Sequence, residues 1–129
     1  MTTSSALGLR KIMAFVATRE PDRAKKFYRD TLGLRLVEEQ LPFALVFDAN
    51  GTMLRVTVVK ELTAAPYTVL GWDVPDIAAT ARELAAAGVK LERYPGMAQD
   101  ELGIWTSPSG AKVAWFKDPD GNVLSVTQF

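Results

Sequence analysis

Residues 48–57 read DANGTMLRVT, and residues 118–127 read DPDGNVLSVT, which is the same pattern repeated 70 residues later. Each stretch opens with a tight turn, because its Asn-Gly or Asp-Gly pair supplies residues that readily adopt left-handed backbone conformations. Each then continues as a strand in which every second residue is apolar. The chain of 129 residues therefore contains two copies of one structural unit, each about half of its length.

The same elements precede the turn in both copies. A β-rich strand leads to a proline, which the first turn of a helix tolerates, and a glycine closes the helix before a second strand. These features are strand 11–18, Pro21, Gly33 and strand 34–37 in the first copy, and strand 67–74, Pro75, Gly88 and strand 89–92 in the second. Each copy is thus a βαβββ module.

The modules, about 9–60 and about 66–129, predict an α+β fold and a single domain over residues 1–129. One helix covers one face of each four-stranded sheet, which leaves the opposite face uncovered. Two such sheets side by side can curve into a shared concave surface. We therefore expect any pocket to lie on the faces that the helices do not cover.

Composition argues against several functional classes. Fifteen basic and fifteen acidic residues give a net charge of zero without a run of one sign, which disfavours nucleic acid as a partner. No segment approaches the roughly 20 apolar residues that cross a bilayer, so we expect no membrane partner. Residues 1–11 lack the apolar run of a signal peptide and the chain has no cysteine, so we expect a cytoplasmic protein.

Histidine is absent as well. Its absence removes the Ser-His-Asp and Cys-His triads, the usual proton shuttle at neutral pH and the commonest transition-metal ligand. Any catalysis would then depend on carboxylates, lysine, tyrosine, backbone dipoles or a bound cofactor.

Three phrases resemble the vicinal oxygen chelate superfamily, also called the glyoxalase/bleomycin-resistance/dioxygenase superfamily. They are DRAKKFY at 22–28, LGL at 32–34 and FKDPDGN at 116–122. With the internal repeat, the resemblance covers nearly the whole chain. It implies a curved, partly open eight-stranded sheet with the helices on the outside. Because the superfamily includes metal-dependent lyases, isomerases and dioxygenases as well as proteins that sequester drugs, the resemblance leaves the function open.

Metal-dependent members of the superfamily place one ligand on the first and last strand of each module. That pattern falls on Met13, Arg55, Val69 and Ser125 in this sequence. Divalent cations prefer carboxylate, imidazole or water ligands, and a fixed guanidinium repels them. A shift of one residue along these strands brings in no set of ligands. The resemblance therefore implies a member that holds no metal and uses no cofactor.

Strand alternation directs one set of side chains under the helices and the other set toward the concave surface. Leu54, Val56, Leu124 and Val126 are the apolar residues expected under the helices. The concave set is mostly apolar with a few polar groups, as in a small-molecule pocket. Together with two tryptophans, the candidate ligand-binding residues are Met13, Phe15, Met53, Arg55, Val69, Asp73, Trp105, Trp115 and Ser125.

Arg55 is the strongest functional candidate among these residues. A guanidinium on a partly desolvated face is costly unless an anion meets it, and it binds carboxylates in a bidentate way. A contact with an anionic ligand and an ordinary ion pair with Asp73 both fit the pattern. Asp73 is a candidate proton acceptor, and a role as partner of Arg55 or as a helix cap before Pro75 is the simpler interpretation.

The remaining candidates have structural alternatives. Ser125 either donates a hydrogen bond to a ligand or fills a position that lost its metal ligand. Trp105 and Trp115 either stack on a ligand or belong to the core, and Tyr28 is a core residue. The stretch 94–103 is either a lid over the pocket or a long surface loop.

These features predict a metal-free protein that binds a small, apolar or aromatic molecule, with or without an anionic group. The resemblance further implies a homodimer. The alternative is a metal-independent isomerase or lyase in which Asp73, or a glutamate such as Glu38 or Glu39, is the base and Arg55 clamps the substrate. A non-catalytic interaction module with a vestigial pocket is a third possibility.

Overall fold

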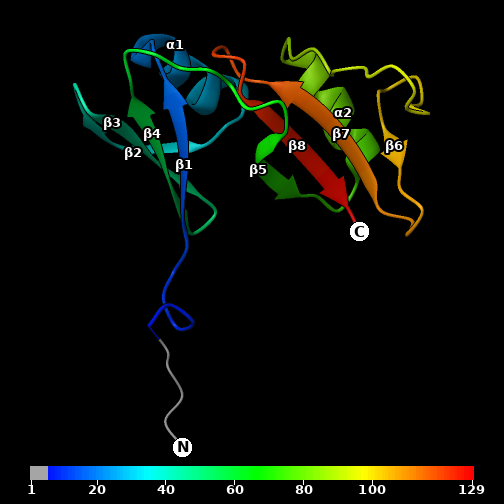
Figure 1. The fold of residues 1–129 in the computed structure, drawn as a ribbon, viewed down its shortest axis with the longest axis horizontal. Helices are drawn as coiled ribbons and strands as arrows, with labels where there is room; N and C mark the ends of the chain where they lie inside the picture. The colour runs from blue at the N-terminus through cyan, green and yellow to red at the C-terminus, as the bar shows by residue number, and fades with distance from the viewer. Residues whose placement is uncertain (1–5) are drawn as a thin grey trace, which may run out of the picture.

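Two βαβββ modules follow one another along the chain in a computed structural model that describes residues 6–129 (Figure 1). Residues 1–5, which the single-domain prediction includes, lie outside the described residues. The first module consists of β1 (Met13–Thr18), α1 (Pro21–Lys25), the π-helical turn η1 (Lys26–Thr31), β2 (Arg35–Gln40), β3 (Ala44–Ala49) and β4 (Thr52–Val58). The second consists of β5 (Thr68–Asp73), α2 (Ile77–Ala86), β6 (Trp105–Thr106), β7 (Lys112–Lys117) and β8 (Val123–Gln128).

The eight strands form two separate sheets of four. Their strand orders are β1-β4-β3-β2 and β5-β8-β7-β6, so each module folds in the same way. The first and last strands of each module pair in parallel, and the other pairs are antiparallel. The predicted α+β fold of two open βαβββ modules is confirmed. The division into two sheets adds that each module keeps its own hydrogen-bonded ladder.

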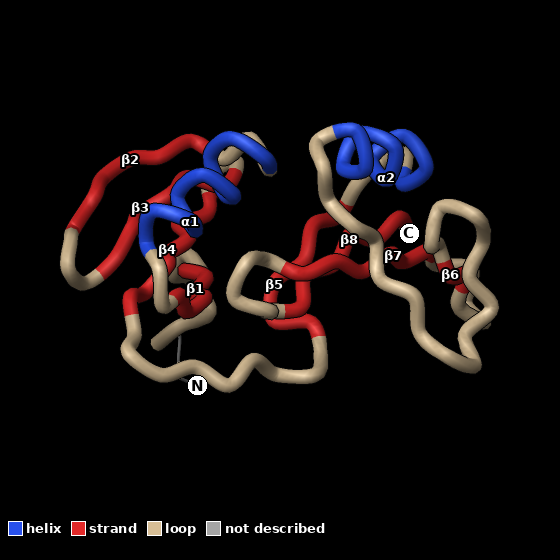
Figure 2. The backbone as a smooth tube through the Cα atoms, turned by 90° about the horizontal axis from the view of Figure 1, so that it is seen from above, coloured by secondary structure: helices blue, strands red, loops and turns tan. Residues whose placement is uncertain are grey.

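The helices lie on the same side of the two sheets and leave the opposite face of each sheet without a covering helix (Figure 2). We call these the open faces. The predicted alternation is confirmed on the covered side, where Leu54, Val56, Leu124 and Val126 are all buried. One hydrophobic cluster contains residues of both modules, including Tyr28, Phe47, Leu84 and Phe116. No helix within residues 6–129 is long and apolar enough to cross a bilayer.

The first helix begins at Pro21, as predicted, because a proline lacks only an N–H that the first turn leaves unpaired. Its last six residues widen into the π-helical turn η1, and Leu32 N–H donates to the carbonyl of Phe27 at 2.9 Å. The helix ends before Gly33, whose φ of 79° is the left-handed conformation expected of a closing glycine.

The second helix corrects the prediction that Pro75 opens it. The helix begins at Ile77, and the Asp76 carboxylate accepts a hydrogen bond from Ala79 N–H at 3.1 Å. Aspartate is one of the preferred N-cap residues, so the cap lies one residue after the proline. Ile77, Ala81 and Leu84 are buried on the inner side of this helix, whereas Ala85 is exposed.

The predicted strand over residues 89–92 is wrong in extent. Leu91 forms a single bridge with Phe116, and Glu92 N–H donates to the Trp115 carbonyl at 2.7 Å. The chain then leaves the sheet, since the Gln99 amide bonds the carbonyls of Glu92 and Gly103 and closes a loop on itself. The short strand β6 pairs with β7 further along the same edge.

The turn after β7 ties the two modules together. The buried Asp118 carboxylate accepts a hydrogen bond from Tyr28 OH at 2.7 Å and from the Asn122 side chain at 2.8 Å. Asn122 also donates to the carbonyl of Ala17 at 2.8 Å. Burial, and then the charge of Asp118, raise the pKa of Tyr28 above its ordinary value, so the phenol keeps its proton. Tyr28 is a core residue, as predicted.

Candidate functional site

The open face of the first sheet carries four of the predicted site residues. Strand register pairs Met13 with Met53 and Phe15 with Arg55, so the four lie together on neighbouring strands β1 and β4. The three apolar side chains stay accessible, at 44% for Met13, 57% for Phe15 and 41% for Met53. Period-two alternation therefore gathers these residues as expected, on a face that no helix covers.

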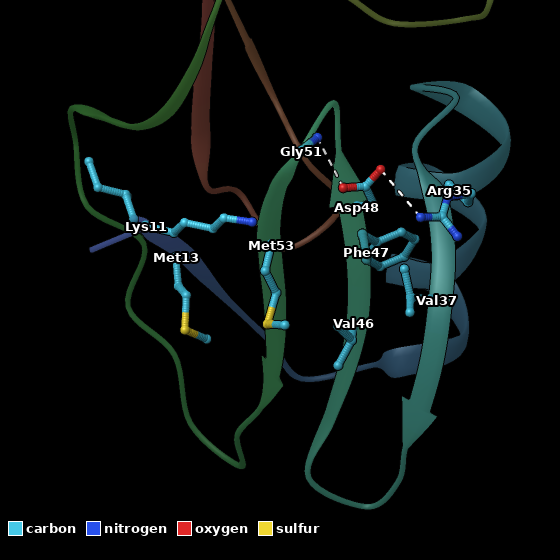
Figure 3. A pocket seen from close by; sticks show the side chains of 10 residues that line it. Lys11, Met13, Arg35, Val37, Val46, Phe47, Asp48, Gly51 and Met53 are labelled. Carbon is cyan, nitrogen blue, oxygen red and sulfur yellow. Dashed lines mark hydrogen bonds and ion pairs between the residues drawn. The ribbon is translucent and has the colours of Figure 1, made fainter. Parts of the chain in front are cut away.

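A groove of about 410 Å³ lies on this face (Figure 3). Its floor is apolar and draws one side chain from each strand of the sheet, namely Met13, Met53, Val46 and Val37. Its other lining residues are Lys11, Ile12, Arg35, Phe47, Asp48 and Gly51. A volume of this size is in the range of small-molecule pockets.

One rim of the groove is charged. Arg35 and Asp48 face each other with Nη2 and Oδ2 3.5 Å apart, and Asp48 Oδ1 accepts from Gly51 N–H at 3.0 Å. The Lys11 side chain extends toward β4 from the opposite side (Figure 3). Sequence reasoning missed these rim residues and Val37 and Val46. Alternation along β2 and β3, combined with their register, is the signal that reveals them.

Within the protein, Arg55 bonds an amide and not Asp73, which was one of its two candidate partners. Its Nη2 donates to Gln40 Oε1 at 3.0 Å, and Gln40 Nε2 donates to the Glu38 carboxylate at 3.1 Å. Within the described part of the chain, no carboxylate lies within ion-pair distance of Arg55. The alternative ion pair with Asp73 is absent, and the two residues belong to different sheets. Arg55 is thus half-buried and held by a neutral amide.

Asp73 is also not the helix cap. It ends β5 with an exposed side chain, while Asp76 caps the helix that follows. Both structural roles considered for Asp73 are therefore wrong. The reason is local, because the cap must stand directly before the first helical residue for its carboxylate to reach the free N–H groups.

The other four candidates lie on the second sheet. Ser125 is buried beside Gly71, where a Cβ added to the glycine would stand 3.0 Å from Ser125 Oγ. Ser125 therefore fills the space beside the β5 backbone. Val69, the remaining apolar candidate, is exposed at the irregular point in the β5–β8 register.

The tryptophans form an aromatic cluster with a residue that sequence reasoning missed. The ring centroids of Trp105 and Trp115 are 6.1 Å apart, and Tyr94 meets Trp115 edge-on at 5.6 Å. All three side chains are partly accessible, so they belong neither to the core nor to the fully exposed surface. Burial, followed by the charge of Glu92, raises the pKa of the Tyr94 phenol.

The structure therefore divides the nine candidates into two groups. The groove is lined by the first module alone, and the aromatic cluster belongs to the second.

A smaller cavity of about 150 Å³ lies where the sheets meet, and its lining contains none of the nine candidate residues. Its lining residues are Ala14, Ala49, Thr52, Leu54, Leu70, Gly71 and Trp72.

The four metal-ligand positions do not fit a divalent cation. Met13, Arg55, Val69 and Ser125 present a thioether, a guanidinium, an alkyl group and a hydroxyl, of which only the last is an oxygen donor. Elsewhere in residues 6–129, no group of three or more His, Cys, Asp or Glu side chains is placed to hold a metal ion. Chemistry through such a metal has no support in this donor set.

Comparison with known proteins places this geometry in a family. The sequence model of the Glyoxalase/Bleomycin resistance protein/Dioxygenase superfamily matches residues 9–126. No curated protein sequence matches the chain. A lactoylglutathione lyase structure from Agrobacterium tumefaciens is similar over 92% of this chain and 93% of its own, with a TM-score of 0.71 and 20% identity. A glyoxalase family protein from Enterococcus faecalis is similar over 94% of this chain and 99% of its own, with a TM-score of 0.72 and 19% identity.

A third similar structure is a glyoxalase/bleomycin resistance protein/dioxygenase from Alicyclobacillus acidocaldarius. It covers 94% of this chain and 92% of its own, with a TM-score of 0.67 and 17% identity. At these identities the structural likeness establishes the fold alone, whereas the family match spans both modules. The chain belongs to the glyoxalase/bleomycin resistance protein/dioxygenase superfamily.

Proposed function

We propose that this protein binds a small, largely apolar or aromatic molecule, which can carry an anionic group, and that it does so without a metal or other cofactor. The groove of about 410 Å³ on the first open face is the observation that carries the proposal. An apolar floor with a few polar groups at its edge is the usual chemistry of a small-ligand site. The two modules act together as one domain in this proposal.

The carboxylates favour a binding protein over a metal-independent isomerase or lyase. The enzyme alternative needs a free base near a clamp on the substrate. Glu38 is engaged by Gln40, and Glu39 forms an ion pair with Lys25 at 2.8 Å. Asp73 lies on the other sheet from Arg55. Glu38 is linked to Arg55 through Gln40 but is an exposed side chain, Glu39 is ion-paired, and Asp73 lies apart from the clamp.

A homodimer is part of the proposal. Phe15, Met13, Met53 and Val37 expose apolar surface on one uncovered sheet face, and such patches commonly mark association surfaces. A second copy lying against this face would close the groove over its ligand. We expect a dimer by sedimentation velocity and its loss in Phe15→Glu, with Tyr67→Glu as a control at another exposed aromatic residue. A monomer at tens of micromolar protein would contradict this part.

The metal-free state and the pocket are tested separately. Elemental analysis of protein purified without chelator should show no stoichiometric divalent metal, and one full equivalent would overturn the metal-free proposal. A thermal-shift screen of apolar and aromatic compounds should raise the midpoint, because a ligand of the folded state stabilises it by RT ln(1 + [L]/Kd). The shift should shrink in Met53→Gln. No stabilising compound, or midpoint shifts unchanged in Met53→Gln, would overturn the groove as the site.

The proposal also places the protein in the cytoplasm. Fractionation of cells should find it there.

A further inference from the structure

We propose that the groove of the first module takes an organic carboxylate with an extended apolar body, such as a medium-chain fatty acid. Its carboxylate would lie at Lys11, and its body would cross the floor formed by Met13, Met53, Val46 and Val37. This inference rests on the proposed function, because it assigns a ligand class to the same groove.

The floor has the shape for an extended body. Its four side chains come from β1, β4, β3 and β2, which are consecutive strands of one sheet. The register places Asp48 opposite Met53 and Val46 opposite Arg55, so the apolar strip crosses the sheet obliquely. Neighbouring strands lie about 4.8 Å apart, so this strip is at least roughly 14 Å long. Val46 anchors this strip at 3% exposure, while the other three remain accessible to a ligand.

The rim has the charge for an anionic head group. Asp48 lies 3.5 Å from the Arg35 guanidinium and accepts from Gly51 N–H, so these two charges largely offset each other. Lys11 lines the same groove, and no carboxylate within residues 6–129 lies within ion-pair distance of its ammonium group. The uncompensated charge at the rim is therefore positive.

The open face of the first sheet, rim included, also carries an excess of positive charge. Three cations, Lys11, Arg35 and Arg55, face two carboxylates, Asp48 and Glu38. Arg55 does not line the groove, and its guanidinium already bonds Gln40. Lys11 is thus the cation available to a groove ligand. A cationic amphiphile would meet this charge and lose affinity.

Three probes with the same eight-carbon tail separate the head group from the apolar body. Isothermal titration calorimetry with octanoate, octanol and octylammonium should give affinities in that order. The octanoate preference over octanol should be about two- to fivefold, the worth of one accessible charge contact, and should fall as salt is raised. From hexanoate to octanoate, affinity should rise by up to about fourfold per methylene group.

Lys11→Gln should remove the octanoate preference and leave octanol binding unchanged. Lys90→Gln, at an exposed lysine of the second module, should change neither affinity. Met53→Gln should weaken all three probes together. Because Lys11 and Met53 are accessible side chains, these variants should fold, which circular dichroism verifies.

The possible failures differ. Equal binding of octanoate and octanol, unaffected by Lys11→Gln, would overturn the head-group inference and leave the apolar pocket standing. The inference of a carboxylate ligand would also be overturned if no octyl probe binds but another apolar compound raises the unfolding midpoint, and does so less in Met53→Gln. The apolar pocket would stand in that case too. Absence of any stabilising compound would overturn the proposed function as well.

Discussion

Replacing Tyr28 by phenylalanine removes one hydroxyl group from the junction of the two modules. That hydroxyl is completely buried and donates to Asp118 at 2.7 Å, across 90 residues of sequence. The substitution leaves the ring in place, so it opens almost no cavity. The substitution therefore removes one hydrogen bond, and with it part of the polar stabilisation of the buried Asp118 carboxylate.

The expected loss follows from the remaining partners of Asp118. A hydrogen bond to a charged group contributes about 1.5–3 kcal/mol. Asp118 keeps the N–H groups of Asp120 and Asn122 and the Asn122 side chain, so the lower half of that range applies. We expect Tyr28→Phe to lower the free energy of unfolding by about 2 kcal/mol, or the midpoint by roughly 6–10 °C for a chain of this size.

Guanidinium chloride denaturation measures this loss, with Tyr67→Phe as the matched control. Tyr67 is 66% exposed, so its variant should remain within about 0.5 kcal/mol of the natural sequence. If both variants have the same stability, the hydroxyl does not hold the modules together and the reasoning about the junction is refuted.

Three further outcomes are expected. Because the pKa of Tyr28 is raised, the folded state keeps the phenol proton at a pH near 10, where the unfolded chain loses it. The free energy of unfolding should therefore fall above that pH, by up to about 1.4 kcal/mol per pH unit. Tyr28→Phe should flatten this fall in chemical denaturation curves, and equal slopes would contradict the assignment. Asp76→Ala should cost about 1 kcal/mol through the lost N-cap whereas Asp73→Ala should be nearly neutral in the same assay; the reverse ranking would restore Asp73 as the cap. Gln99→Ala should speed amide hydrogen exchange within residues 94–103 while the unfolding midpoint changes little, and unchanged exchange would show that the side chain does not hold the loop.

Local pattern predicted the features that depend on near neighbours along the chain. Asn50 and Gly51, with φ of 50° and 95°, form the tight turn expected of an Asn-Gly pair. The related turn at residues 118–122 is longer, and among its residues only Gly121 is left-handed. Sequence similarity concealed this difference, because the turn shape depends on Asp118 bonding the backbone of Asp120 and Asn122.

The predicted strand at 89–92 failed for a similar reason. Its residues suit a strand, and they do reach the edge of β7 at Leu91. Pairing with β7 stops where the chain turns away into the loop, and there the Gln99 side-chain amide donates to the carbonyls of Glu92 and Gly103. A contact made by one side chain across several residues leaves no periodic signal in the sequence.

By itself, the sequence determined the two modules, the family and the faces of β4 and β8 that lie under the helices. The modules and the covered faces follow from the repeat and from period-two alternation within β4 and β8, and the family follows from the resemblance of residues 22–28, 32–34 and 116–122. Only the tertiary structure decided which side chains share a site. Folding of the first sheet brought Lys11, Arg35 and Val46 into one groove with Met13 and Met53. The separation of the two sheets placed the tryptophans elsewhere, because neighbours across strands are set by hydrogen-bonded pairing and packing between distant segments.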